Sequence, residues 1–236
     1  MGRIFEVRKS AMFARWDKMA KNFTRIGKEI AIAVKSGGPE PDNNPALRRC
    51  YINAKACNMP KDRVEAAIKR AMGKDTTNYD EIVYEGYGPH GVAIMVETAT
   101  DNSTRTVANV RMHFTKSQGA LGTSGSVSFG FTRMGEFKVK NIGQNIDELE
   151  LELIDFGAEE VFEDEDGILI YASFGSFGTI QKELENRKIE ILSSGFERIP
   201  QITKKLTEAE MADVEKLIEK IEEDDDVMNV YHTMEE

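Results

Sequence analysis

Long apolar runs are absent from this chain of 236 residues. No stretch reaches the roughly 18 consecutive apolar residues that a membrane-spanning helix needs, and the first six residues do not form the apolar core of a secretory signal peptide. Gly2 is not a myristoylation site, because Glu6 stands where that motif requires serine or threonine. We therefore expect a cytoplasmic protein that makes no use of a membrane.

Cysteine is scarce, with Cys50 and Cys57 as the two examples. Both lie in a segment, residues 45–57, whose pattern is typical of a helix. Seven helical residues rise by about 10.5 Å, whereas a disulfide needs Cα atoms within about 7 Å of each other. We expect two free thiols packed against the helix interior, as in a reducing compartment.

Histidine is also rare, and the three examples, His90, His113 and His232, are far apart in the sequence. None stands beside a candidate nucleophile, and no spacing of His and Cys matches a zinc site. The acidic runs at 163–166 and 222–226 lack the ligand spacing of a calcium loop and are typical of solvent-exposed turns and helix ends. We predict no catalytic residues, no metal and no cofactor.

Charge is unevenly distributed along the chain, although the total is −10. Residues 1–79 contain 17 Lys and Arg against 8 Asp and Glu, so that this part carries +9. Residues 80–236 contain 14 basic and 33 acidic residues, so that this part carries −19. Such a division indicates a basic module attached to an acidic body.

The basic module is predicted to be a helical bundle over residues 1–79. Apolar residues recur every three or four positions over residues 10–34, which is the period of an amphipathic helix. Further helices are expected at 45–57 and 60–72, each beginning near a proline suited to the first helical turn. A polar stretch at 73–78 then marks a domain boundary.

The pattern of residues 80–236 predicts an α+β domain, formed by residues 80–134 plus 205–236. An inserted ferredoxin-like α+β domain is predicted at 135–204. In the first, strands are expected at 82–87, 92–98 and 126–131, with a helix beginning near residue 101. In the insertion, strands, helices and a hairpin follow the order β-α-β-β-α-β, beginning with a strand at 137–142. A last helix is expected at 207–222, and we expect the strand at 227–231 to return to the first sheet.

The strongest functional signal is the basic face of the first helix, opposite its apolar stripe. The residues predicted to bind nucleic acid are Arg3, Arg8, Lys9, Arg15, Lys18, Lys21, Arg25 and Lys28. An ordinary solvated face mixes both signs, because like charges one turn apart destabilise a helix. A polyanion is therefore the simplest partner, while a plain solvated face and a membrane-surface helix remain alternatives.

Two glycine-rich segments invite comparison with phosphate-binding loops. Residues 119–125 lack the Lys-Ser/Thr of a P-loop and lead into a predicted strand instead of a helix. Residues 85–91 are most simply a connection between two strands of a hairpin. We interpret both segments as structural loops.

Several motifs together resemble the YebC/PmpR family over nearly the whole chain. They are Asn58-Met59-Pro60-Lys61-Asp62, Tyr84-Glu85-Gly86-Tyr87-Gly88-Pro89-His90-Gly91, Thr100-Asp101-Asn102 with Arg105-Thr106-Val107, Gly119 with Leu121-Gly122, Gly125-Ser126-Val127, and Val230-Tyr231-His232. The resemblance implies a helical bundle followed by an α+β domain with a ferredoxin-like insertion. The chain departs from the family's usual Gly-His-Ser-Lys-Trp start, since it begins Met1-Gly2-Arg3-Ile4-Phe5.

The resemblance implies a DNA-binding transcriptional regulator, without enzymatic activity. The family also includes a mitochondrial translational activator and bacterial members that help the ribosome to synthesise proline-rich stretches. The alternative is therefore a ribosome-associated translation factor that binds ribosomal RNA, and the −19 body is easier to place on a ribosome than on a bare duplex. Protein partners on the acidic domains, in particular on the ferredoxin-like unit, are a further possibility.

Overall fold

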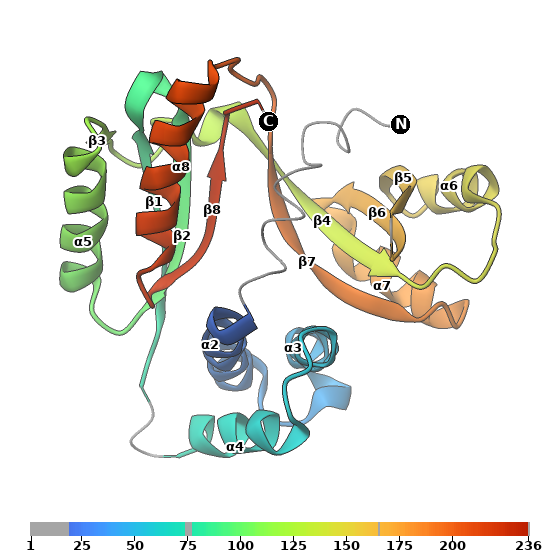
Figure 1. Ribbon diagram of the computed structural model, residues 1–236. Coiled ribbons are helices and arrows are strands. Elements are labelled where there is room, and N and C mark those ends of the chain that lie inside the picture. The colour runs from blue at the N-terminus through green and yellow to red at the C-terminus, as the bar shows by residue number, and fades with distance from the viewer. Residues whose placement is uncertain (1–18, 74–76, 165, 236) are drawn as a thin grey trace.

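The structure, a computed structural model, describes residues 19–73, 77–164 and 166–235. In these residues a group of three helices adjoins two antiparallel four-stranded sheets (Figure 1). This arrangement confirms the predicted fold class. The predicted limits at residues 135 and 204 stay a prediction, because the strand that crosses residue 135 begins earlier, at Phe131.

The helical part consists of α2 (Met19–Gly37), α3 (Pro45–Ala56) and α4 (Lys61–Ala71), with a 3-10 turn at Pro41–Asn43. The second helix begins where the sequence predicts, because Asn44 caps it by accepting a hydrogen bond from the Leu47 amide at 3.0 Å. The helices enclose a small apolar core around Ile30, Leu47 and Cys50.

The first sheet has the order β3-β1-β2-β8. Its strands are β1 (Asp80–Tyr87), β2 (Ala93–Thr100), β3 (Ala120–Leu121) and β8 (Val227–His232). Helices α5 (Ser103–Lys116) and α8 (Glu208–Glu222) cover one face, where Phe114 and Leu217 are fully buried. The antiparallel pairing of β8 with β2 confirms that the last strand returns to this sheet.

The second sheet has the order β5-β6-β4-β7. Its elements are β4 (Phe131–Val139), α6 (Ile146–Ile154), β5 (Ala158–Asp164), β6 (Gly167–Ser173), α7 (Phe177–Asn186) and β7 (Ile191–Pro200). This β-α-β-β-α-β chain, with the first strand between the third and fourth, is the ferredoxin-like topology. Both helices pack on one face around Phe137, Leu153 and Ile180.

One prediction about strands is wrong. The sequence predicts strands at 126–131 and 137–142, whereas the structure has a 3-10 turn at Ser128–Gly130 and one continuous strand, β4. The reason is that the amides of Val127 and Ser128 donate to the Glu85 carboxylate at 2.8 Å each, so they cannot join a sheet ladder.

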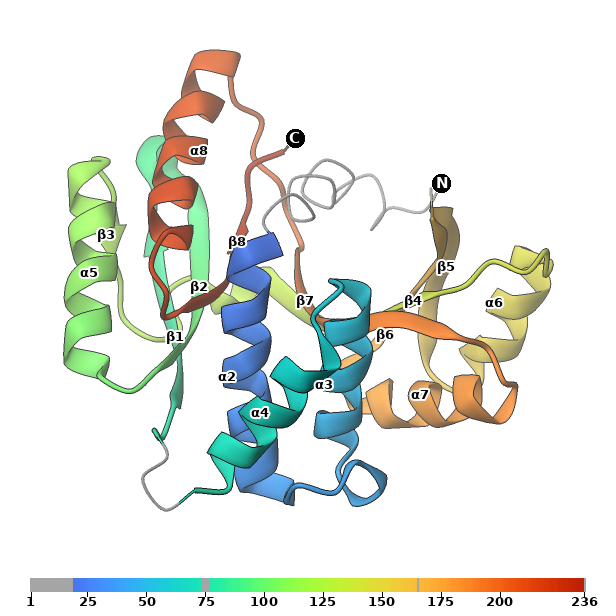
Figure 2. The same ribbon diagram turned by 60° about the horizontal axis from the view of Figure 1, so that its bottom comes forward.

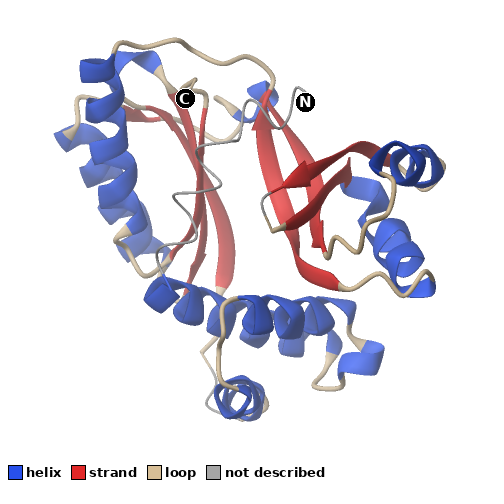
Figure 3. Cartoon of the chain, turned by 45° about the vertical axis from the view of Figure 1, so that its right-hand side comes forward, coloured by secondary structure: helices blue, strands red, loops and turns tan. Residues whose placement is uncertain are grey.

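The two sheets turn their helix-free faces toward each other, with α5 and α8 on one outer side and α6 and α7 on the other (Figure 3). The helical part lies across one end of this arrangement. Helix α2 stands beside the first sheet and α3 lies against β7 (Figure 2), while α4 is farthest from both sheets (Figure 1).

Candidate nucleic-acid interface

The residues predicted to bind nucleic acid divide into two groups in the structure. Arg3, Arg8, Lys9, Arg15 and Lys18 lie outside the described residues. Lys21, Arg25 and Lys28 lie on α2, as the sequence predicts. These three do not form an exposed row: Lys21 and Arg25 are half-buried and Lys28 is buried.

Lys21 and Arg25 face the rest of the molecule. The Lys21 ammonium donates to the carbonyl of Glu222, at the end of α8, over 3.0 Å. Arg25 lines a cavity of about 630 Å³ between α2, α3, β7 and β8. Both side chains thus stand at the boundary between the helical part and the sheets.

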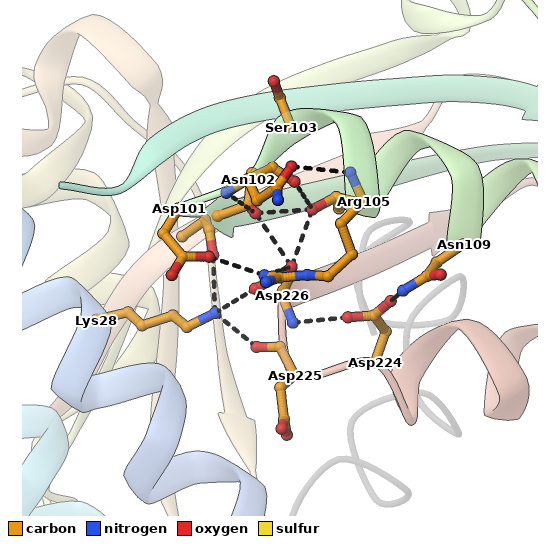
Figure 4. Close-up of polar contacts among 12 residues, drawn as sticks. Lys28, Asp101, Asn102, Ser103, Arg105, Asn109, Asp224, Asp225 and Asp226 are labelled. Carbon is orange, nitrogen blue, oxygen red and sulfur yellow. Dashed lines mark hydrogen bonds and ion pairs between the residues drawn. The ribbon is translucent and has the colours of Figure 1, made fainter. Parts of the chain in front are cut away.

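Lys28 is 7% exposed, so the expectation that it faces solvent on a basic helix face is wrong. Its ammonium donates to the Ala99 carbonyl at 2.8 Å, to the Asp225 carbonyl at 2.7 Å and to the Asp226 carboxylate at 3.0 Å (Figure 4). Three acceptors satisfy the three donors of a lysine ammonium. Lys28 therefore attaches α2 to the first sheet and is not available to a phosphate.

Asp226 is the centre of this polar cluster. Besides Lys28, its carboxylate accepts from the Arg105 guanidinium at 2.5 Å and from the Thr100 hydroxyl at 3.0 Å, and the Thr106 hydroxyl lies 2.9 Å away (Figure 4). Burial opposes ionisation of the carboxyl, but the hydrogen bonds from Arg105, Lys28 and Thr106 outweigh it and lower the pKa of Asp226 to about 2. The carboxylate is therefore charged at neutral pH.

The motif at residues 100–107 thus has a structural role in this chain. Asn102 caps α5 by accepting from the Arg105 amide at 3.1 Å, and the Thr100 hydroxyl accepts from the Asn102 amide at 2.9 Å. The turn between β2 and α5 is therefore shaped to present Arg105 and Thr106 to the buried carboxylate of Asp226.

A second attachment joins α3 to β7. The Asn53 amide donates to the Ser194 carbonyl at 2.8 Å, and the Ser194 backbone N–H donates back to the Asn53 side-chain oxygen at 3.0 Å. Nearby, the exposed Lys55 forms an ion pair with Glu190 at 3.0 Å. The helical part is thereby held to both sheets, through α2 and through α3.

Exposed basic side chains of the helical part gather on α4, the helix that lies away from the sheets (Figure 2). They are Lys61, Arg63, Lys69 and Arg70. The sequence-based prediction missed them because it followed the longer stripe on the first helix. The available signal was the spacing of Arg63 and Arg70, which places two guanidinium groups two turns apart on one helix face.

The glycine-rich segment 119–125 and the three residues after it already bind a carboxylate of the chain itself. The buried Glu85 carboxylate accepts from the backbone N–H groups of Gly125, Val127 and Ser128 at 2.8 to 2.9 Å. Burial raises the pKa of Glu85, but the three amide donors prevail and the pKa is lowered. These amides are therefore not free to bind phosphate, in agreement with a structural loop.

No group of three or more His, Cys, Asp or Glu in the described residues is arranged to hold a metal ion. Cys50 and Cys57 are free, as expected, and burial raises the pKa of Cys50 to about 12, which keeps it a thiol. None of the helices over 19–73, 77–164 and 166–235 combines the length and apolar character needed to cross a membrane.

Comparisons with known proteins match the chain to one family over nearly its whole length. Residues 3–74 match a family model described as the TACO1/YebC protein N-terminal domain, and residues 79–234 match the TACO1/YebC second and third domain. A protein of Flavobacterium johnsoniae is 69% identical over 236 residues and 100% of both chains, and one of Parabacteroides distasonis is 57% identical over 100% of this chain and 98% of its own. Both are named "probable transcriptional regulatory protein".

A solved structure shares this fold. The crystal structure of a conserved hypothetical protein from Aquifex aeolicus superimposes with a TM-score of 0.80 at 37% sequence identity. The match covers 94% of this chain and 93% of that one. The similarity therefore extends over the helical part and both sheets.

Proposed function

The chain belongs to the TACO1/YebC family, whose members are regulatory proteins and not enzymes, and from this premise we propose that it is a cytoplasmic regulator of gene expression that binds nucleic acid through its helical part. The relatives' name, "probable transcriptional regulatory protein", favours DNA as the target. In this proposal the residues of α4 make the described part of the contact. Arg3, Arg8, Lys9, Arg15 and Lys18 would add to it.

The observation that carries the proposal is the separation of charge between the two parts of the fold. The described helices at 19–73 contain 11 basic and 5 acidic residues, while the sheets and their helices are strongly acidic. A nucleic acid would be attracted to the first and repelled by the second. Helix α4, which carries these exposed basic residues, also lies at the end of the molecule farthest from the sheets (Figure 1).

A salt titration of binding tests this orientation. Each phosphate neutralised on duplex DNA releases condensed counterion, so log affinity falls by about 0.9 per unit of log salt concentration for each contact. Changing Lys61 and Lys69 to Gln should weaken binding to every sequence and make the slope shallower by about 1 to 2 units. Stability should change by at most about 0.5 kcal/mol per site, because both side chains are exposed.

The matched control is a Lys182→Gln, Lys216→Gln variant, which removes the same charge from exposed positions on α7 and α8. It should leave affinity and slope as they are, or lower the affinity slightly, because the acidic part becomes more negative. Equal effects of the two double variants would mean that only net charge matters, and an unchanged slope in the α4 variant would show that α4 does not contact phosphate.

Ribosomal RNA is the second candidate target, and the acidic sheets favour it. A ribosome can accept one basic end of the protein and leave the acidic parts outside, whereas a bare duplex repels them along its length. Sedimentation of the tagged full-length chain from gently lysed cells separates the two. Comigration with ribosomes that is lost after ribonuclease treatment supports RNA, and ribonuclease-resistant, deoxyribonuclease-sensitive association supports DNA.

A further inference from the structure

A second hollow in the molecule lies wholly within the basic helical part. It has a volume of about 430 Å³ and runs between α2, α4 and residues 77–79, where the chain leaves the helices. This volume is within the range of small-molecule sites. Unlike the hollow beside Arg25, it involves no residue of either sheet's strands.

The chemistry of this hollow combines aromatic rings with cations. Phe23 and Tyr79 line it, and the Arg63 guanidinium lies 6.0 Å from the centre of the Phe23 ring. The buried Lys28 ammonium lies 5.2 Å from the centre of the Tyr79 ring. Small alanine side chains form the floor, and the exposed Arg63 and Arg70 stand at the edge on one face of α4.

Gly27 contributes to the open space of this hollow. It lies in the interior of α2, where glycine weakens a helix relative to alanine. Among the residues that the structure describes, no atom lies within 4 Å of a Cβ added here, so no close neighbour requires the glycine. Gly27 lines the hollow, so the lack of a side chain at this position enlarges the space that the described residues leave open.

We propose that this hollow binds one unpaired nucleotide of a single-stranded or looped nucleic acid. The base would lie on the alanine and glycine floor against Phe23 and Tyr79, since aromatic rings accept any base by stacking. Its flanking phosphates would meet Arg63 and Arg70, whose planar guanidinium groups suit phosphate oxygens. A base held in a duplex cannot enter. This inference rests on the proposed binding of nucleic acid and names the form of it that is recognised.

The test fills the hollow without weakening the fold. Gly27→Leu places a side chain in the open space and improves helix propensity, so the melting temperature should stay the same or rise. Gly178→Leu is the matched control, because Gly178 also lies in a helix, α7, and no atom of the described residues is within 4 Å of its added Cβ. The full-length proteins are titrated with ten-nucleotide single strands of RNA and DNA, with duplexes, and with an abasic strand of equal length.

We expect Gly27→Leu to lose about tenfold in affinity for the single strands, the order of magnitude for one stacked base. Its affinity for duplex and abasic strands should change by less than about twofold, and Gly178→Leu should match the unaltered chain throughout. The comparison of RNA with DNA strands shows which backbone the site prefers.

Three results would overturn the inference. If the unaltered chain binds abasic strands as tightly as normal single strands, no base is recognised. If Gly27→Leu remains folded and keeps full single-strand affinity, the base does not enter this hollow, while phosphate binding by the helical part still stands. If the unaltered chain binds no strand of any kind, the proposed function fails together with the pocket.

Discussion

A buried ammonium needs a counter-charge, and for Lys28 that charge comes from the other end of the chain. Asp226 is 198 residues away in the sequence, yet the two groups form an ion pair at 3.0 Å with both side chains less than 10% exposed. Removing one partner of such a pair leaves an uncompensated buried charge, which costs about 3 to 5 kcal/mol. This cost makes the cluster around Asp226 sensitive to the loss of either charge.

At this scale we predict that Asp226→Asn destabilises the protein by about 3 to 5 kcal/mol in denaturant unfolding at neutral pH. The pH dependence of stability follows from the lowered pKa of Asp226. Because the folded-state pKa is about 2 and the ordinary value is 3.8, the stabilisation of about 2 kcal/mol is present above pH 4 and disappears as the pH falls toward 2. The variant should lack this acid-sensitive component.

Asp101→Asn is the control for that experiment, because Asp101 pairs with the same Arg105 guanidinium at 2.8 Å but is exposed. Its effect should be below about 1 kcal/mol, since exposed ion pairs contribute little. If the two variants were equally destabilised, the burial of Asp226 would not be the cause of its importance.

At the scale of elements, the periodicity of apolar residues predicts the helices and strands well where each has one buried face. Helices α3 and α4 begin and end within one or two residues of the predicted limits, and the order of elements in the second sheet is as predicted. The same periodicity does not predict which residues of α2 are buried, because α2 packs against α3 and α4 on one side and against the first sheet on another. A helix with two contact faces buries a lysine that the 100° projection places in solvent.

The loop before β4 is a second place where periodicity does not predict the structure, because a distant residue determines it. Its amides are bound by Glu85, which a pattern of β-branched residues around 126–131 cannot indicate. We predict that Glu85→Gln destabilises the protein by about 1 to 3 kcal/mol, because a side-chain amide cannot accept from three backbone N–H groups as a carboxylate does. Hydrogen exchange at Gly125, Val127 and Ser128 should accelerate.

Glu81→Gln, at an exposed position on the same face of the strand, provides the comparison. It should change stability by less than about 0.5 kcal/mol and leave exchange in the loop as it is. Unchanged exchange at Val127 and Ser128 in Glu85→Gln would mean that the loop is held by other contacts.

On the scale of the whole molecule, Lys28 of α2 and Asn53 of α3 hold the helical part to the sheets, and neither contact involves α4. Lys28 joins α2 to the first sheet (Figure 4), and Asn53 joins α3 to β7. The predicted division into a basic helical part and acidic sheets thus has a physical counterpart in the fold. The sequence could not show which basic residues are used up at the boundary, because that depends on contacts between distant segments.

The second attachment allows the independence of the helical part to be tested. Asn53→Ala removes both hydrogen bonds to Ser194, so hydrogen exchange at the Ser194 amide should accelerate while exchange at Val96, in the first sheet, should not change. Asn109→Ala, which removes a hydrogen bond of 2.8 Å to Asp224, is the matched control and should leave Ser194 protected. If α4 alone meets the nucleic acid, Asn53→Ala should bind it within about twofold of the unaltered chain, because no contact to phosphate is lost. A folded Asn53→Ala variant with much weaker binding would show instead that the target spans the helices and the second sheet, and that their relative position is part of the recognition.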